Sequence, residues 1–464
     1  MTERLTPMDA SFLYLEEPNV HMHVGGLAVF DPSGSPRGVL TLDRLRVLTS
    51  ARLAMVPRFR QRVMFPPLDA ARPVWVDDPE LDLDYHVRRI AVPPPGGPRQ
   101  LAALTGQIHS QQLDRDRPLW EMYLVEGLED GHQAVLTKTH HAMLDGVGGM
   151  DAATALLDVT PEPAEPVARP WNPPPLPSRG HLFVDAAADR VREPAGSLLR
   201  TGRRVATRPG SALRDLAAVA AGAASVLTRG LPPATPFNVP VGGTRRFAMA
   251  EIPLEEARAV KGALGGTVND VILTAVAGGV SRLLESRGEP TEGLRYRTMM
   301  PVSLRSDSEH GSPGNRVTTV YPDLPVGPME PLERLRGVRE ETQRMKASTQ
   351  GRAATVLIQG TMWIPPAVHR GLGRWGNRHL RIFNMVASNI PGPQVPIYLD
   401  GTRLVAYYPL MPLGATVALS VGIVTLVGVM GFGFTADWDA VPDLELLALE
   451  VGEEFDALKK AAHV

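Results

Sequence analysis

Apolar and polar positions along the chain follow two periods. Strand-like segments, with alternation or short apolar runs, lie at residues 23–31, 133–141, 246–254 and 294–304. Apolar residues at helical spacing mark residues 42–55, 98–113 and 269–288. Asn269 is a candidate N-cap of the last helix. Because strands and helices are mixed on both sides of the chain's middle, the pattern predicts an α/β protein with two halves of similar size.

A proline-rich stretch separates the two halves. It reads PEPAEPVARPWNPPPLP over residues 161–177. Since proline fixes φ and lacks an N–H donor, we expect an extended connection there. The alanine- and arginine-rich segment that follows favours helix, with breaks at Pro194 and Pro209. The predicted organisation is therefore an N-terminal half at 1–160, a linker and helical bridge at 161–235, and a C-terminal half at 236–464.

Residues 406–436 form a segment without a charged side chain, and this segment is long enough for a membrane-spanning helix. The stretch is also interrupted by glycines, with Val, Ile, Thr and Phe between them. This composition favours buried strands with a turn near Gly428. We therefore expect strands in this segment.

A second uncharged segment, residues 353–368, includes Trp363 and Ile364 and is followed by an arginine-rich segment. On a helix, these arginines share one face. One interpretation is a solvated helix face, and the other is a contact with phospholipid headgroups or a CoA phosphate. The arginines are Arg370, Arg374, Arg378 and Arg381.

Composition excludes several classes of function. The 464 residues carry 48 basic and 50 acidic side chains, so no overall positive field attracts nucleic acid or an anionic membrane. The absence of cysteine excludes thiolate nucleophiles, acyl-cysteine intermediates and cysteine-ligated metals. The N-terminal segment does not have the pattern of a signal peptide, so we expect a cytoplasmic protein.

The strongest candidate for chemistry is the segment HHAMLDG at the end of an apolar strand. His140 and His141 are adjacent, and adjacent strand residues face opposite sides, so only one of them can serve a given reacting atom unless the strand breaks there. An imidazole can accept a proton from a hydroxyl and return it, Asp145 could fix the local geometry, and Gly146 would allow close approach of a substrate. Two alternatives are a metal site and satisfied core histidines.

This segment matches the HHxxxDG motif of the CoA-dependent acyltransferase superfamily. Further segments occur in the same order as in one of its families: LTPMDASFLYLE, HMHVGGLAVF, WVDDPELDLDYHVRR, RPLWEMYLVEGL, TVNDVILTAVAGG, PVSLR, GNRV, SNIPGP and DWDAVPDL. Together they resemble the bacterial wax ester synthase/diacylglycerol acyltransferase family from about residue 5 to residue 455.

The resemblance implies two chloramphenicol-acetyltransferase-like domains, each a mixed sheet flanked by helices, with a channel at their interface. It implies that His141 is the general base, that His140 is structural, and that Asp145 pairs with Arg305 of the other domain. It also places substrate-binding motifs at Pro118-Leu119-Trp120 and Asn269-Asp270. Asn269 is a possible oxyanion donor or only part of a helix cap, and Trp120 either packs the strand or contacts the acyl chain.

The implied reaction is direct transfer of a long-chain acyl group from acyl-CoA to diacylglycerol or a fatty alcohol, without an acyl-enzyme and without a cofactor or metal. Since such substrates are poorly soluble, we expect peripheral contact with a membrane or lipid droplet at Trp363, Ile364 and the arginines. Two other functions stay open: acylation of polyketide or other secondary alcohols on the same fold, and non-catalytic lipid binding. The sequence does not set the oligomeric state.

Overall fold

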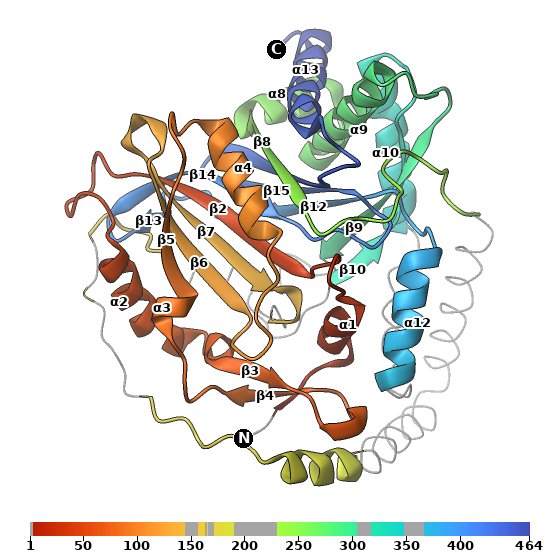
Figure 1. Cartoon of the computed structure of the whole chain (residues 1–464). Helices are drawn as coiled ribbons and strands as arrows, with labels where there is room; N and C mark the ends of the chain where they lie inside the picture. Colours follow the sequence, from red (N-terminus) through yellow and green to blue (C-terminus); the bar gives the residue numbers. More distant parts are fainter. Residues whose placement is uncertain are drawn as a thin grey trace, which may run out of the picture.

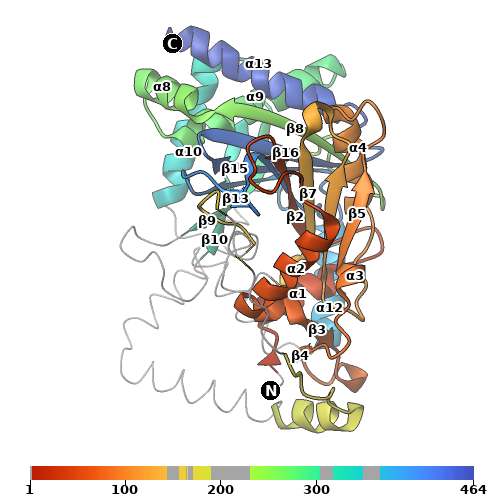
Figure 2. The same cartoon turned by 90° about the vertical axis from the view of Figure 1, so that its left-hand side faces the viewer.

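The computed structural model describes residues 3–143, 156–162, 165, 171–189, 230–303, 317–347 and 366–464. Within these ranges the chain forms two large mixed sheets, with helices packed against them, and a small three-stranded sheet (Figure 1). This confirms the predicted α/β class. The small sheet lies at the end of the molecule opposite helices α8 (Leu254–Leu264) and α13 (Leu444–Ala462) (Figure 2). Its strands are β1 (Glu3–Arg4), β4 (Val74–Asp77) and β3 (Gln61–Met64).

The first large sheet holds the strand that ends at the two histidines. Only β5 and β6 run parallel, and the other described neighbours are antiparallel. Successive residues of a strand face opposite sides, so Leu136 packs toward helix α4 (Pro98–His109) while Val135 joins the core on the other side. In order, the strands are β13 (Tyr398–Leu399), β14 (Thr402–Leu410), β2 (His23–Asp31), β7 (Gln133–His140), β6 (Trp120–Glu126) and β5 (Val87–Ala91).

Helices α1 (Pro7–Leu15), α2 (Leu42–Arg52) and α3 (Leu83–His86) belong to the same half. The helix at α1 begins with a side-chain cap, because Thr6 accepts a hydrogen bond from the Asp9 N–H. Its buried residues Leu13 and Tyr14 join the core on the Val135 side of the sheet. α1 packs on helix α12 (Pro366–His379) and on the turn that follows β7.

The second large sheet belongs to the C-terminal half. Its long central helix α9 (Val268–Ser286) is almost wholly buried between the sheet and α13 (Leu444–Ala462). The other helices of this layer are α8 (Leu254–Leu264) and α10 (Pro331–Ala347), seen with α13 at the top of Figure 1. The strands in order are β10 (Val317–Val320), β9 (Arg295–Ser303), β12 (Met385–Pro391), β15 (Leu419–Leu426), β16 (Val429–Asp437) and β8 (Arg245–Pro253), with β11 (Asp323–Pro325) beside β9.

The N-terminus of α9 corrects one prediction. The cap residue is Thr267, whose side chain accepts from the Asp270 N–H, while the Asp270 carboxylate accepts from the Thr267 N–H. This reciprocal pair is a capping box. Asn269 lies inside the first turn, so its prediction as the cap is wrong.

The uncharged residues 406–436 form strands, as predicted. β15 and β16 are joined by a tight turn at Val427 and Gly428, both with positive φ. Within the described ranges no single helix has the length and apolar character needed to cross a membrane. The pair α8 and α9 meets that test only jointly and bends by 100° at the break between them.

The two large sheets meet where β14, from the C-terminal part of the sequence, joins the first sheet. It pairs with β2 and also packs on β15 and β16 of the second sheet. A Cβ added at Gly433 would lie 1.9 Å from the Pro409 carbonyl oxygen, and one at Gly431 would lie 2.0 Å from that of Tyr407. These two glycines therefore allow the backbones of β14 and β16 to touch. The limits at 160 and 236 stay a prediction, and the first sheet also takes β13 and β14 from the second half of the sequence.

The linker region is described only in part. Residues 171–178 have no regular secondary structure and residues 179–189 are helical. The predicted breaks at Pro194 and Pro209 lie outside the described residues.

Candidate active site

The two adjacent histidines occupy different elements. His140 ends β7, and His141 opens the short 3-10 turn at His141–Met143. The His140 N–H donates to the Leu119 carbonyl at 2.9 Å, and the His141 N–H donates to the Met22 carbonyl at 2.7 Å. Neighbouring segments therefore hold the backbone on both sides of the point where the strand ends.

The His141 ring stacks on Phe12 of α1. The ring centroids are 3.9 Å apart and the planes are inclined by 22°. Burial lowers the pKa of His141 to about 4, and neighbouring His140 acts in the same direction, while a hydrogen bond with its own backbone carbonyl acts against them. The imidazole is therefore neutral at pH 7, with one ring nitrogen donating to that carbonyl and the other holding a lone pair. This is the state that a general base requires.

The His140 side chain lies in a different environment, buried near Glu16 and His23. His140 Nε2 is 3.6 Å from Glu16 Oε2, and His23 Nε2 is 3.4 Å from Glu16 Oε1. Arg115 also donates its Nε–H to Glu16 Oε2 at 3.0 Å. Burial raises the pKa of Glu16, but the two imidazoles and Arg115 outweigh this and hold it well below its usual range. Glu16 is thus an ionised carboxylate facing His140.

The Pro118-Leu119-Trp120 segment lies beside this region through its backbone, because Leu119 accepts from His140. Trp120 is buried, donates its Nε1–H to the Phe59 carbonyl at 2.8 Å, and stacks on His86 with centroids 4.4 Å apart. Both the ring face and the N–H therefore have protein partners. These contacts correspond to the packing interpretation of Trp120.

The Asn269-Asp270 pair divides into two environments. The Asp270 carboxylate is buried and accepts from the Thr342 hydroxyl at 2.7 Å as well as from Thr267. The Asn269 Oδ1 accepts from the Asn389 Nδ2 at 3.1 Å, which joins the TVNDV segment to the SNIPGP segment on β12. Both contacts lie within the C-terminal half: Asp270 is held by Thr267 and Thr342, and Asn269 contacts the SNIPGP segment.

Helix α12 (Pro366–His379) carries three of the four predicted arginines, and they are turned toward the protein. Arg370 donates to Asp69 at 3.0 Å, and Arg374 donates to the carbonyls of Tyr14 and Glu16 at 3.0 and 2.9 Å. Arg378 pairs with Glu17, and Arg381, beyond the helix end, donates to the Pro232 carbonyl at 2.9 Å.

The opposite side of α12 is apolar and open to solvent. Leu372 and Trp375 are 58% and 55% exposed, and Val368 is 48% exposed. These residues follow helical spacing, so they share one side of the helix. Leu380 and Ile382, just beyond the helix, are also exposed. The apolar side of α12, defined by Val368, Leu372 and Trp375, therefore faces the solvent. The sequence had instead suggested that the arginine side of this helix faces outward.

Five predicted residues lie outside the described ranges: Asp145, Gly146, Arg305, Trp363 and Ile364. The proposed Asp145–Arg305 pair thus stays a prediction. Conversely, Phe12 and Glu16 received no role from the sequence, although both belong to the segment LTPMDASFLYLE. The feature that points to Glu16 is a buried carboxylate close to two histidines. The sequence does not show this feature, because only the fold brings these residues together.

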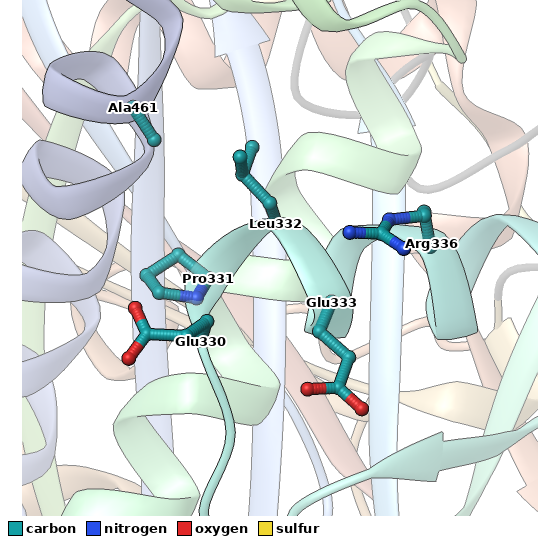
Figure 3. A pocket seen from close by; sticks show the side chains of 6 residues that line it. All are labelled: Glu330, Pro331, Leu332, Glu333, Arg336 and Ala461. Carbon is teal, nitrogen blue, oxygen red and sulfur yellow. The ribbon is translucent and has the colours of Figure 1, made fainter.

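A surface hollow of about 440 Å³ lies between the start of α10 and the end of α13 (Figure 3). Its lining contains none of the predicted site residues. It is formed by Glu330, Pro331, Leu332, Glu333, Arg336 and Ala461.

Comparisons with known families cover most of the chain. Residues 5–272 match the family described as the wax ester synthase/diacylglycerol acyltransferase catalytic domain. Residues 313–459 match the family described as the C-terminal domain of the same proteins.

Curated relatives extend over nearly the whole length. A probable diacylglycerol O-acyltransferase from Mycobacterium tuberculosis is 34% identical over 455 residues, covering 96% of this chain and 93% of the relative. A second protein of the same description and species is 34% identical and covers 99% of both chains. A putative diacylglycerol O-acyltransferase from that species is 36% identical over 434 residues, covering 90% of this chain and 89% of the relative.

Among solved structures, the wax ester synthase/diacylglycerol acyltransferase from Marinobacter aquaeolei VT8 has a TM-score of 0.70 at 27% identity, covering 99% of this chain and 100% of that chain. The first condensation domain of the CDA synthetase has a TM-score of 0.58 at 15% identity, covering 100% of this chain and 97% of that chain. The second likeness shows a shared fold alone.

Proposed function

The chain belongs to the wax ester synthase/diacylglycerol acyltransferase family, and on this premise we propose that it transfers a long-chain acyl group from acyl-CoA to the hydroxyl of diacylglycerol, forming triacylglycerol. The observation that supports this most directly is the place of His141, which opens the turn directly after β7 and stacks its ring on Phe12. A fatty alcohol is the second acceptor to consider, because the Marinobacter neighbour is named for both activities.

In the proposed reaction, His141 takes the proton of the acceptor hydroxyl. The oxygen attacks the thioester carbonyl, the carbon–sulfur bond breaks, and the imidazolium returns the proton to the CoA thiolate. No acyl-enzyme forms and no cofactor takes part, which agrees with a chain that has no cysteine. Asp145 and Arg305 are proposed to brace the turn after His141, and Gly146 to leave room for the substrate.

Asn269 is the proposed contact for the thioester oxygen, since its side chain is already oriented by Asn389. Pro118, Leu119 and Trp120 are proposed to shape the wall beside His141 through packing. We also propose that the substrates reach His141 through a channel between the two halves.

We also propose that the apolar side of α12 is where the protein meets a membrane or lipid droplet. The acyl chains and diacylglycerol reside in lipid, and a helix with an outward apolar side can lie in the interface. Arginines 370, 374 and 378 would then hold α12 to the protein rather than bind headgroups. Trp363 and Ile364 precede this helix and are proposed to extend the contact.

The test incubates purified protein with palmitoyl-CoA and either dioleoylglycerol or hexadecanol, and follows CoA release and ester formation. His141→Ala should lose about a hundredfold or more in turnover because the base is gone. His181→Ala serves as the control, since His181 is exposed and pairs only with Asp185 among its described ionic contacts. Absence of ester with both acceptors would refute the proposed function, and a fully active His141→Ala would refute the mechanism.

A further inference from the structure

The carboxylate of Glu16 faces His140, although no step of the proposed reaction uses it. Its side chain is 2% exposed, and Glu16 is the C-cap residue that directly follows helix α1. The same helix carries Phe12, whose ring stacks on His141. One short helix and its C-cap residue therefore reach both histidines of the HHxxxDG motif, Phe12 at His141 and Glu16 at His140.

One hydrogen bond to the His140 ring assigns its tautomer. Its Nδ1 accepts the backbone N–H of Ala142 at 3.1 Å, so Nδ1 carries a lone pair rather than a proton. The ring is then neutral, and its one proton is on Nε2, the nitrogen 3.6 Å from Glu16 Oε2. A carboxylate on that side favours this tautomer over the other.

The tautomer matters because of where Ala142 lies. It follows His141 in the 3-10 turn, and it is fully buried. If Nδ1 carried the proton, it would be a donor facing another donor, the Ala142 N–H. The hydrogen bond between them would be lost, and it is the only one that the His140 side chain makes to this turn among the described hydrogen bonds. The orientation of His141 would then be less well defined.

Arg115 contacts the Glu16 carboxylate from the solvent-exposed side. Its guanidinium donates to Glu16 Oε2 and to the Leu13 carbonyl, and its side chain is 38% exposed. It keeps the buried carboxylate charged. His23 faces the other carboxylate oxygen, and His21 stacks on His23.

We infer that Glu16 is a positioning residue: it keeps the His140 proton on Nε2, so that Nδ1 accepts the Ala142 N–H and fixes the turn that carries His141. The inference rests on the proposed role of His141. It assigns Glu16 a function that a buried ion pair with Arg115 alone does not have.

The test compares Glu16→Gln with Glu17→Gln. Both variants remove the charge of a buried carboxylate, but Glu17 pairs with Arg378 instead of facing His140. Glu16→Gln should lower kcat about tenfold while KM for palmitoyl-CoA changes less than about twofold, because orientation and not binding is lost. Glu17→Gln should leave kcat within about twofold of the parent.

A second readout is independent of activity. In protein labelled with ¹⁵N-histidine, the His140 ring signals are identified by their loss in His140→Asn. The parent should show an unprotonated Nδ1, Glu16→Gln should show a shift toward protonated Nδ1, and Glu17→Gln should match the parent. A protonated Nδ1 in the parent, or unchanged signals in Glu16→Gln, would overturn the inference.

If Glu16→Gln does not fold, Arg115→Gln replaces it, since Arg115 is partly exposed. Arg115→Gln should lower kcat and shift the His140 signals as expected for Glu16→Gln, and Arg115→Lys should restore both. An active parent with unchanged kcat in these variants would overturn the inference and leave the proposed function standing. An inactive parent would instead refute the proposed function, while the nitrogen spectra would still decide the tautomer.

Discussion

The rings of Phe12 and His141 stack with their centroids 3.9 Å apart, although 128 residues lie between them in the chain. Phe12 belongs to α1, which packs on the turn after β7. The aromatic ring covers one face of the imidazole and excludes water from it. This cover contributes to the burial that lowers the pKa of His141 to about 4.

Replacing Phe12 by alanine should raise the pKa of His141 toward the ordinary value of 6.5. The acid limb of the kcat/KM profile reports this group in the free enzyme, so the limb should move to higher pH. Phe59→Ala is the matched control, because Phe59 packs against the same core but its ring lies beside Trp120, tilted by 50°, and not against His141. A profile for Phe12→Ala that coincides with the parent's would contradict the role of the ring.

The apolar side of α12 gives a second prediction. Leu372→Ser combined with Trp375→Ser should weaken sedimentation with liposomes of phosphatidylcholine and dioleoylglycerol by about tenfold or more, since most of the inserted area is lost. Leu449→Ser, at an equally exposed leucine of α13, should bind as the parent does. Equal binding of the double variant would exclude this side of α12 as the contact.

Much of the fold could be predicted because local patterns determine it. The alternation in residues 23–31 and 133–141 became β2 and β7, and the glycine-rich apolar segment became the hairpin of β15 and β16. Both signals depend on neighbours in the sequence, so no knowledge of the tertiary structure was needed.

The parts that failed depend on contacts between distant residues. The arginine spacing on α12 correctly indicates a shared side, but the direction of that side is set by Tyr14, Glu16 and Asp69. Asn269 is a good cap by residue type, yet Thr267 with Asp270 forms the reciprocal pair two residues earlier. Glu16 acquires its environment only when α1 meets the end of β7.

The contact between β14 and β16 gives a third prediction, on stability. Gly433→Ala places a Cβ where the Pro409 carbonyl oxygen lies, 1.9 Å away, and backbone cannot yield as a side-chain end can. We expect a loss of at least about 2 kcal/mol in the free energy of unfolding. Gly452→Ala in α13 has open space and should be neutral or stabilising by about 0.5–1 kcal/mol. Denaturant unfolding of both variants would show the difference, and equal stability would contradict the close approach.

His23, which is buried, and His141, which is partly buried, predict that acid destabilises the fold. Burial lowers the pKa of His141 to about 4 and that of His23 to about 3, whereas both have a pKa near 6.5 in the unfolded chain. Between these values the unfolded state binds protons that the folded state does not, so stability is complete above pH 6.5 and falls as the pH drops toward 4. Glu16 acts with the same sign at lower pH, because its pKa is lowered as well.

Thermal unfolding at pH 7.5 and pH 5.0 measures this effect. The midpoint of the parent should be lower at pH 5.0, and the difference between the two midpoints should shrink in His23→Gln, which removes one of the titrating groups. His181→Gln alters an exposed histidine and should keep the parent's difference. Since each variant is compared with itself at two pH values, a general loss of stability in His23→Gln does not affect the comparison. A difference as large in His23→Gln as in the parent would show that the buried His23 does not cause the acid sensitivity.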